Sequence, residues 1–142
     1  MQSSARSPGQ VIEVVMSRYA LVVDDVRIAA TTIAQTLELL GYETEIAYGP
    51  RPALESLARR IPDVILLDIN LPGVDGVEVC RYIRCEPGTA QVPIIAISSE
   101  VQEDTVARIL EAGANIFMPK PIDVEALEQA LKRLLGNKRP TL

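Results

Sequence analysis

Histidine and tryptophan are absent from this chain, and aromatic residues make up only 4% of it. Without histidine, the chain can form neither a Ser-His-Asp triad, nor a Cys-His pair, nor a His-ligated metal site. With so few aromatic rings, it offers no evident platform on which nucleic-acid bases could stack. The net charge of −5 also argues against direct nucleic-acid binding, because such binding requires a basic surface.

Cysteines and long apolar runs are scarce as well. Cys80 and Cys85 are the only cysteines, too few for a zinc site or a disulfide framework, and we interpret them as unpaired. No apolar run approaches the ~20 residues that cross a membrane. Residues 1–10 also lack the apolar stretch of a signal peptide. These absences predict a cytoplasmic protein that does not bind membranes.

The length of 142 residues and the 48% share of hydrophobic residues favour one domain with one core. We expect a flexible extension over residues 1–17, a compact domain over 18–136 and a polar tail over 137–142. Within the extension, residues 11–16 are largely apolar. An additional strand, a covering helix and a partner-binding segment all remain open interpretations, and a translation start at Met16 would make the segment irrelevant.

Apolar runs alternate with helical patterns along the compact part. We expect strands at 19–23, 42–48, 64–68, 93–97 and 115–118, and helices at 26–40, 54–61, 76–84, 101–111 and 123–136. The apolar faces of the second and fourth helices are expected to be Leu54, Leu57, Ala58 and Ile61, and Val106, Ile109 and Leu110. This alternation predicts a parallel sheet covered by helices on both faces. Strand 42–48 carries two glutamates on one face and suits a sheet edge.

Polar residues follow four of the expected strands. In open parallel sheets, the functional site lies beyond the carboxyl ends of the strands. The residues placed there are Asp24 and Asp25 after the first strand, Asp68 at the end of the third, Ser98 after the fourth and Lys120 after the fifth. The sequence therefore predicts that three carboxylates, a hydroxyl and an ammonium group meet at one rim.

This set of groups suits phosphoryl transfer to a carboxylate. Three carboxylates repel one another unless a cation offsets their charge, and oxygen ligands suit Mg²⁺ or Mn²⁺. Lysine and serine can donate hydrogen bonds to phosphoryl oxygens. A carboxylate nucleophile, a divalent ion and a lysine together predict that Asp68 is a phosphoryl acceptor.

Each of these residues has an ordinary structural interpretation when it is taken alone. Asp68 could be a turn residue, Asp24 and Asp25 could cap the following helix, and Ser98 could be a helix N-cap. Lys120 could be a surface lysine. We favour the functional interpretation because all five residues fall at the same rim.

The chain resembles the receiver domain of two-component response regulators over about residues 18–136. The matching motifs are Val22-Val23-Asp24-Asp25, Asp63 to Asp68, Leu71 to Gly76, Ala112-Gly113-Ala114 and Lys120-Pro121. The resemblance implies an α/β, flavodoxin-like (βα)5 three-layer sandwich with strand order 2-1-3-4-5. It implies that Asp68 receives a phosphoryl group from a histidine kinase or a histidine phosphotransfer protein, which suits a chain without histidine.

The same resemblance implies roles for the neighbouring residues. Asp25, Asp68 and the backbone carbonyl of Asn70 would bind Mg²⁺ directly, and Asp24 mostly through water. Ser98 and Lys120 would contact the phosphate, and Phe117 would move inward with Ser98 as a switch. Asn70 and Glu100 occupy positions that influence the lifetime of the phosphate, and the Lys120–Pro121 bond would be cis. Phe117 by itself would be an ordinary core aromatic.

The resemblance also bears on how the protein works. We expect a monomer or weak homodimer that signals to a downstream effector and catalyses only its own phosphotransfer and dephosphorylation. No output domain is expected after Gly136, so the chain would be a single-domain regulator, a relay intermediate or a fragment. One alternative is a receiver-like binding module that works without phosphorylation. Another is a flavin or nucleotide carrier, which is disfavoured because the two aspartates after the first strand would repel phosphate.

Overall fold

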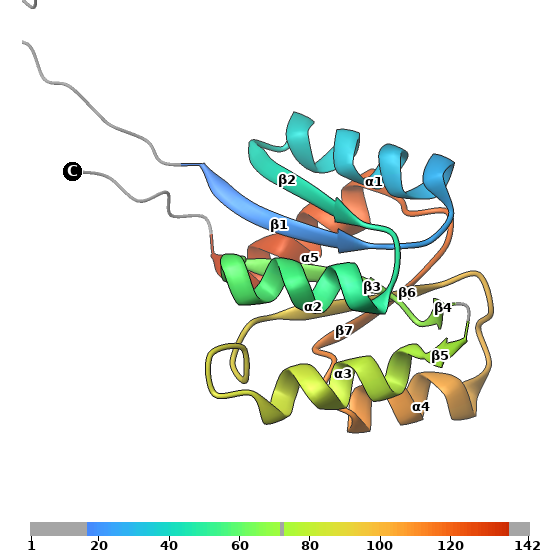
Figure 1. Cartoon of the computed structure of the whole chain (residues 1–142). Helices are drawn as coiled ribbons and strands as arrows, with labels where there is room; N and C mark the ends of the chain where they lie inside the picture. The colour runs from blue at the N-terminus through green and yellow to red at the C-terminus, as the bar shows by residue number, and fades with distance from the viewer. Residues whose placement is uncertain (1–16, 72, 137–142) are drawn as a thin grey trace, which may run out of the picture.

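The computed structural model of the chain describes residues 17–71 and 73–136 (Figure 1). The apolar segment 11–16, the rest of the extension before residue 17, and the tail 137–142 lie outside these residues, so the interpretations of them stay predictions. Among the helices that the structure describes, none is both long enough and apolar enough to span a membrane.

Five parallel strands form the main sheet, in the order β2-β1-β3-β6-β7. Their bounds are Arg18–Val23 for β1, Tyr42–Ala47 for β2, Val64–Asp68 for β3, Ile94–Ser98 for β6 and Ile116–Pro119 for β7. The expected order 2-1-3-4-5 of the main strands is confirmed, because β6 and β7 are the fourth and fifth of them. Strand β2 is an edge strand, as its glutamates indicated.

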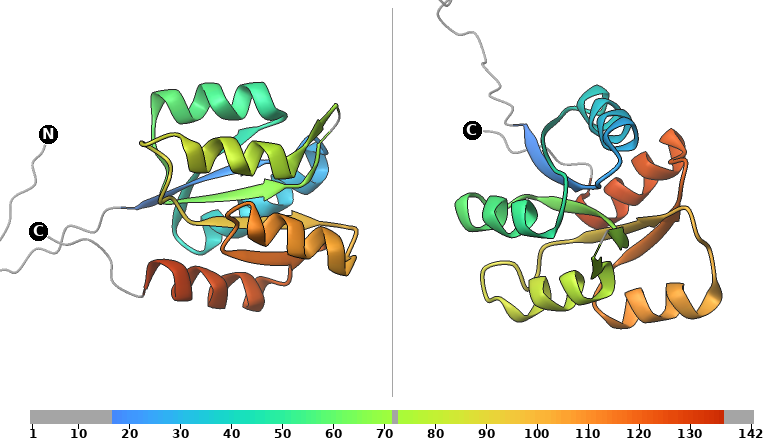
Figure 2. Two further views of the ribbon diagram at one scale, coloured as in Figure 1. Left: turned by 90° about the horizontal axis from the view of Figure 1, so that it is seen from below. Right: turned by 45° about the vertical axis from the view of Figure 1, so that its right-hand side comes forward.

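Two helical layers cover the sheet (Figures 1 and 2). Helices α1 (Arg27–Leu39) and α5 (Val124–Leu135) cover one face, and α2 (Pro50–Arg59), α3 (Gly76–Cys85) and α4 (Glu103–Glu111) cover the other. Successive residues of β3 point to opposite faces, so Ile65 packs towards α2 and α3 while Leu66 packs towards α1 and α5. Every residue of β3 and β6 is buried, as expected of central parallel strands. The expected three-layer fold is therefore confirmed.

The second helix differs from the expectation at its end. Ala58 is exposed and the side chain of Ile61 is 49% exposed, although both were expected to face the core. Helix α2 ends at Arg59, and Arg60 has an extended backbone with φ −155° and ψ 130°. The helical periodicity therefore no longer predicts the orientation of the Ile61 side chain. The residues that α2 buries are Ala53, Ser56 and Leu57.

The fourth helix is shorter and less buried than expected. Helix α4 begins at Glu103, so Val101 lies in the connection before it and is 62% exposed. Within α4, Ile109 is buried, but Leu110 is 42% exposed. The neighbours of α4 include the edge strand β7 and helix α3.

A small hairpin after β3 was not predicted. Strands β4 (Asn70–Leu71) and β5 (Val74–Asp75) pair in antiparallel fashion outside the main sheet. Each has only two residues, which is too short for a strand pattern to show in the sequence. At the base of the hairpin, the Gly76 N–H donates to the Ile69 carbonyl at 3.1 Å.

Candidate phosphoryl-acceptor site

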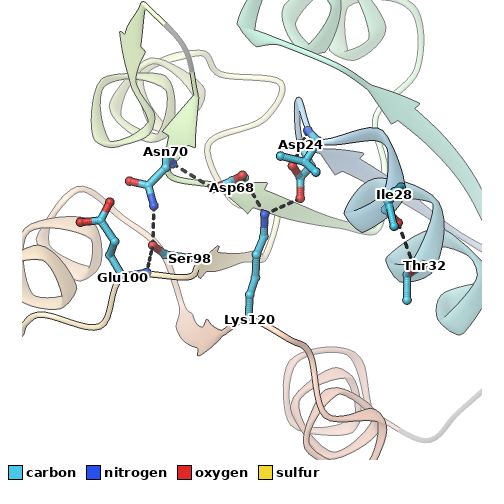
Figure 3. A network of polar contacts seen from close by, with 9 residues as sticks. Asp24, Ile28, Thr32, Asp68, Asn70, Ser98, Glu100 and Lys120 are labelled. Carbon is cyan, nitrogen blue, oxygen red and sulfur yellow. Dashed lines mark hydrogen bonds and ion pairs between the residues drawn. The ribbon is translucent and has the colours of Figure 1, made fainter.

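The carboxyl ends of the central strands bring together the polar residues that the sequence placed there (Figure 3). Asp24 follows β1, Asp68 ends β3 and Ser98 ends β6. Their residue exposures are only 0%, 3% and 0%. Lys120 follows β7, and its backbone N–H donates to the Ser98 carbonyl at 2.8 Å, which fixes the end of β7 beside the end of β6. The site therefore lies on the rigid, buried part of the sheet.

Three carboxylates converge on one point of the rim. Asp24, Asp25 and Asp68 each offer one carboxylate oxygen, and these oxygens all lie within 4.8 Å of one another. The Lys120 ammonium lies 2.8 Å from Asp24 Oδ2 and 3.0 Å from Asp68 Oδ2. Three carboxylates and one ammonium group give this mostly buried site a formal charge of −2. Such a site has the charge and the oxygen donors that suit one divalent cation.

The two oxygens of the Asp68 carboxylate have different partners. Oδ1 accepts a hydrogen bond of 2.9 Å from the Asn70 backbone N–H, and Oδ2 accepts one from Lys120 Nζ. Burial raises the pKa of Asp68, and the charge of Asp24 adds to this effect, while the Asn70 N–H and Lys120 oppose it. Burial lowers the pKa of Lys120, but its contacts with the Asp24 and Asp68 carboxylates outweigh burial and raise the pKa. Lys120 therefore stays charged, and Asp68 is a buried carboxylate held in one orientation.

The two carboxylate oxygens of Asp24 differ in their hydrogen bonding. Its Oδ1 accepts from the Val26 N–H at 2.9 Å, whereas its buried Oδ2 has the Lys120 ammonium nearby but no well-directed hydrogen bond. The helix-cap interpretation of Asp24 is wrong, because the residue before α1 is Val26 and no side chain caps that helix. The open lone pairs of Oδ2 suit a metal ion or a water bound to one.

Ser98 does not cap a helix either. Helix α4 starts after Gln102, and the Ser98 hydroxyl instead accepts hydrogen bonds from the Glu100 N–H at 2.9 Å and from Asn70 Nδ2 at 2.7 Å. The contact between Asn70 and Ser98 was missed by the sequence analysis. No pattern signals it, since the two residues lie 28 positions apart and meet only because β3 and β6 are neighbours.

Two further expectations concern the end of β7. Phe117 is half-buried, pairs with Ala96 of β6 and packs against the core on the α2–α4 face of the sheet. Its pair with Ala96 lies two residue pairs before the pair of Ser98 with Pro119, next to which Lys120 donates to Ser98. The Lys120–Pro121 peptide bond is cis, as the resemblance implied.

Comparison with known sequences identifies relatives of this chain. The sequence model of the response regulator receiver domain matches residues 20–132. The response regulator MprA of Mycobacterium tuberculosis H37Rv is 35% identical over 126 residues, which are 88% of this chain and 54% of that protein. MprA of Mycobacterium avium strain 104 is 33% identical over 120 residues, which are 84% of this chain and 52% of that protein. The chain thus spans about half the length of the curated relatives it matches.

Solved structures agree as well. A putative response regulator from Chloroflexus aurantiacus superposes with a TM-score of 0.81 at 30% identity, covering 86% of this chain and 100% of the other. The receiver domain of the sensor histidine kinase PA1611 from Pseudomonas aeruginosa PAO1 superposes with a TM-score of 0.79 at 31% identity, covering 86% and 100%. That domain has a magnesium ion coordinated in its active site cleft. Motifs, fold and sequence similarity lead to the same conclusion, and the chain belongs to the response regulator receiver domain family.

Proposed function

We propose that this protein accepts one phosphoryl group on Asp68 from a histidine kinase or a histidine phosphotransfer protein and passes the signal to a downstream effector. The observation that carries the proposal is the buried Asp68 carboxylate, which is held by Lys120 and by the Asn70 N–H next to two further aspartates. Membership of the receiver family supports the proposal. Catalysis is limited to the protein's own phosphotransfer and dephosphorylation.

The chemistry follows from these positions. An oxygen of the Asp68 carboxylate attacks the phosphorus atom, the new P–O bond forms, and the P–N bond to the donor imidazole breaks. The bonding pair leaves with the imidazole nitrogen, and the acyl phosphate remains on Asp68. The Lys120 ammonium and the Ser98 hydroxyl, which flank Asp68, are donors for the phosphoryl oxygens. Phe117 follows Ser98 inward, and Asn70 and Glu100 set the lifetime of the phosphate.

The acidic residues fit a divalent metal ion. Asp25, Asp68 and the backbone carbonyl of Asn70 would hold Mg²⁺ or Mn²⁺, and Asp24 would contact it through water. The formal −2 charge of the site and the open lone pairs of Asp24 Oδ2 support this assignment. When bound, the ion offsets the negative charge of the incoming phosphoryl group. The magnesium ion in the related PA1611 receiver domain supports it as well.

Phosphoryl uptake tests the proposed function. The purified protein is incubated with Mg²⁺ and acetyl phosphate, and its intact mass is measured. We expect one added phosphoryl group that hydroxylamine removes, and none in Asp68→Asn. Asp104→Asn, an exposed aspartate of α4, is the matched control and should take up phosphate as the wild type does. Uptake in Asp68→Asn equal to the wild type would assign the acceptor to another residue.

No uptake in the wild type would favour the alternative, a receiver-like module that works through protein contacts without phosphorylation. The chain retains all three aspartates and the lysine, which is why we favour phosphorylation. The monomeric or weakly dimeric state, the cytoplasmic location and the absence of direct nucleic-acid binding stay predictions.

Magnesium should stabilise the protein. At ten times its dissociation constant, Mg²⁺ should raise the free energy of unfolding at pH 7 by about 1.4 kcal/mol, because it binds the folded state alone. Urea unfolding with and without Mg²⁺ measures this difference. Asp25→Asn should lose most of the effect, since Asp25 is a proposed direct ligand, whereas the exposed control Glu103→Gln should keep it. An equal effect of Mg²⁺ on Asp25→Asn and the wild type would contradict the metal assignment.

A further inference from the structure

The β4–β5 hairpin contacts the segment from β6 to α4 at two points. Asn70 and Asp75 lie directly opposite each other in the hairpin. The Asn70 side-chain amide donates to the Ser98 hydroxyl at 2.7 Å, and Arg108 Nη2 donates to Asp75 Oδ2 at 2.7 Å. Ser98 ends β6 and Arg108 lies in α4. One cross-strand pair thus contacts both the end of β6 and helix α4.

The hairpin is itself firmly held at its base. Asp75 Oδ1 accepts from the Val77 N–H at 3.0 Å and so caps α3. A Cβ atom at Gly76 would lie 2.8 Å from the Ile69 carbonyl oxygen and still closer to the Ile69 Cα, so the backbones touch there. The hydrogen bond from Val77, together with the Arg108 guanidinium, holds the pKa of Asp75 below its usual range. Asp75 is therefore an ionised residue in a fixed position at neutral pH.

Helix α4, in contrast, buries little of its side-chain surface. Ile109 is the residue that α4 buries, and Val101 before the helix and Leu110 within it are exposed. Arg108 is the neighbour of Ile109 in the chain. Because α4 buries little, even the modest contribution of an exposed ion pair, that between Arg108 and Asp75, adds to what positions the helix.

We infer that the β4–β5 hairpin is a clasp, formed by Asn70 and Asp75, which holds Ser98 and Arg108 and so fixes the position of α4 in the unphosphorylated protein. Arg108 is a positioning residue that acts through Asp75. If the proposed function holds, phosphorylation of Asp68 draws the Ser98 hydroxyl towards the phosphoryl group and away from Asn70. The clasp then opens at one end, and α4 gains freedom. Only this second step rests on the proposed function.

Amide hydrogen exchange in the unphosphorylated protein, followed by NMR, tests the closed clasp. Asp75→Asn keeps the N-cap of α3, since asparagine caps as well as aspartate, but removes the charge that pairs with Arg108. We expect Asp75→Asn and Arg108→Gln each to speed exchange of the α4 amides about two- to fivefold, the effect of losing an exposed ion pair. The double variant should add little to either single variant. Arg108→Lys should restore most of the protection, and Arg133→Gln on α5 is the exposed control.

The exchange rate of the Glu100 amide distinguishes a clasp from an ion pair that acts only locally. This amide donates to the Ser98 hydroxyl, eight positions away from Arg108. If the hairpin is a clasp, Arg108→Gln also speeds exchange of the Glu100 amide, because Asp75 and Asn70 move together. For the same reason, Asn70→Ala speeds exchange of both the Glu100 amide and the α4 amides. Unchanged α4 exchange in Asp75→Asn and Arg108→Gln would overturn the inference. So would a Glu100 amide that responds to Asn70→Ala but not to Arg108→Gln.

Acetyl phosphate tests the opening step and separates it from the proposed function. Phosphorylated wild-type protein should show faster α4 exchange, and Arg108→Gln should show a smaller further increase because its clasp is already open. Phosphorylation that leaves α4 exchange unchanged would overturn the opening step. If the clasp variants speed α4 exchange but the wild-type protein takes up no phosphoryl group, the closed clasp is supported and the proposed function is refuted.

Discussion

Replacing Lys120 with methionine should destabilise the folded protein by about 3 kcal/mol at pH 7, the cost of removing one partner from a buried ion pair. The Lys120 ammonium lies within 3.0 Å of both Asp24 and Asp68, and the side chains of these aspartates are 0% and 4% exposed. Methionine preserves most of the side-chain volume, so the loss would come from charge rather than from packing. Without the ammonium, two buried carboxylates face each other without a counter-charge unless a metal ion binds.

The destabilisation by Lys120→Met should shrink as the pH falls. Burial already holds the pKa of Asp68 above its usual value, and loss of Lys120 raises it further. A carboxyl group whose folded-state pKa is raised costs stability when the pH exceeds that pKa and costs none below its usual pKa of about 4. Lys120, with a pKa above its own usual value, stays charged throughout this window. The pH dependence therefore comes from the carboxylates.

Urea unfolding of Lys120→Met at pH 7 and near pH 4, without metal, measures this effect. Lys132→Met replaces a half-exposed lysine of α5 and should change the free energy of unfolding by less than about 0.5 kcal/mol. The double variant Lys120→Met with Asp68→Asn should recover part of the loss at pH 7, since it removes one of the two buried charges. A loss that is the same at both pH values would mean that Lys120 contributes by packing and not by its charge.

Gly76→Ala should destabilise the protein by about 2 kcal/mol, which is within the range for overpacked sites. The added Cβ would lie 2.8 Å from the Ile69 carbonyl oxygen and closer to the Ile69 Cα. Both are backbone atoms directly after Asp68, so they cannot rotate away as a flexible side chain would. Helix propensity favours alanine at this first residue of α3 by up to about 1 kcal/mol, and the clash has to exceed that gain.

The same substitution should also slow phosphoryl uptake. The hydrogen bond from the Gly76 N–H to Ile69 closes the base of the hairpin that carries Asn70, and Asn70 orients both Asp68 and Ser98. Urea unfolding and the rate of uptake from acetyl phosphate measure the two effects. Gly88→Ala is the matched control, because the nearest atom to its added Cβ is the end of the Ile61 side chain at 3.9 Å. If Gly76→Ala were as stable and as fast as Gly88→Ala, the close approach would not constrain the site.

The fold class and the residues of the acceptor site follow from the amino-acid sequence alone. Short apolar runs mark buried strands, their alternation with helical patterns requires a parallel sheet, and the carboxyl ends of parallel strands share one edge. Asp24, Asp68, Ser98 and Lys120 could be placed together on this basis alone, although each was ambiguous by itself. These signals lie within a few residues along the chain, which is the range over which a sequence pattern is informative.

How those residues pair, and where the helices and strands end, depends on tertiary packing. Ile61 continued the spacing of α2 but is 49% exposed, and the helix stops before it. The contacts of Asn70 with Ser98 and of Asp75 with Arg108 join segments 28 and 33 positions apart. Hydrogen bonds and ion pairs depend on ångström-scale distances between side chains, and those distances exist only once the sheet and both helical layers have packed.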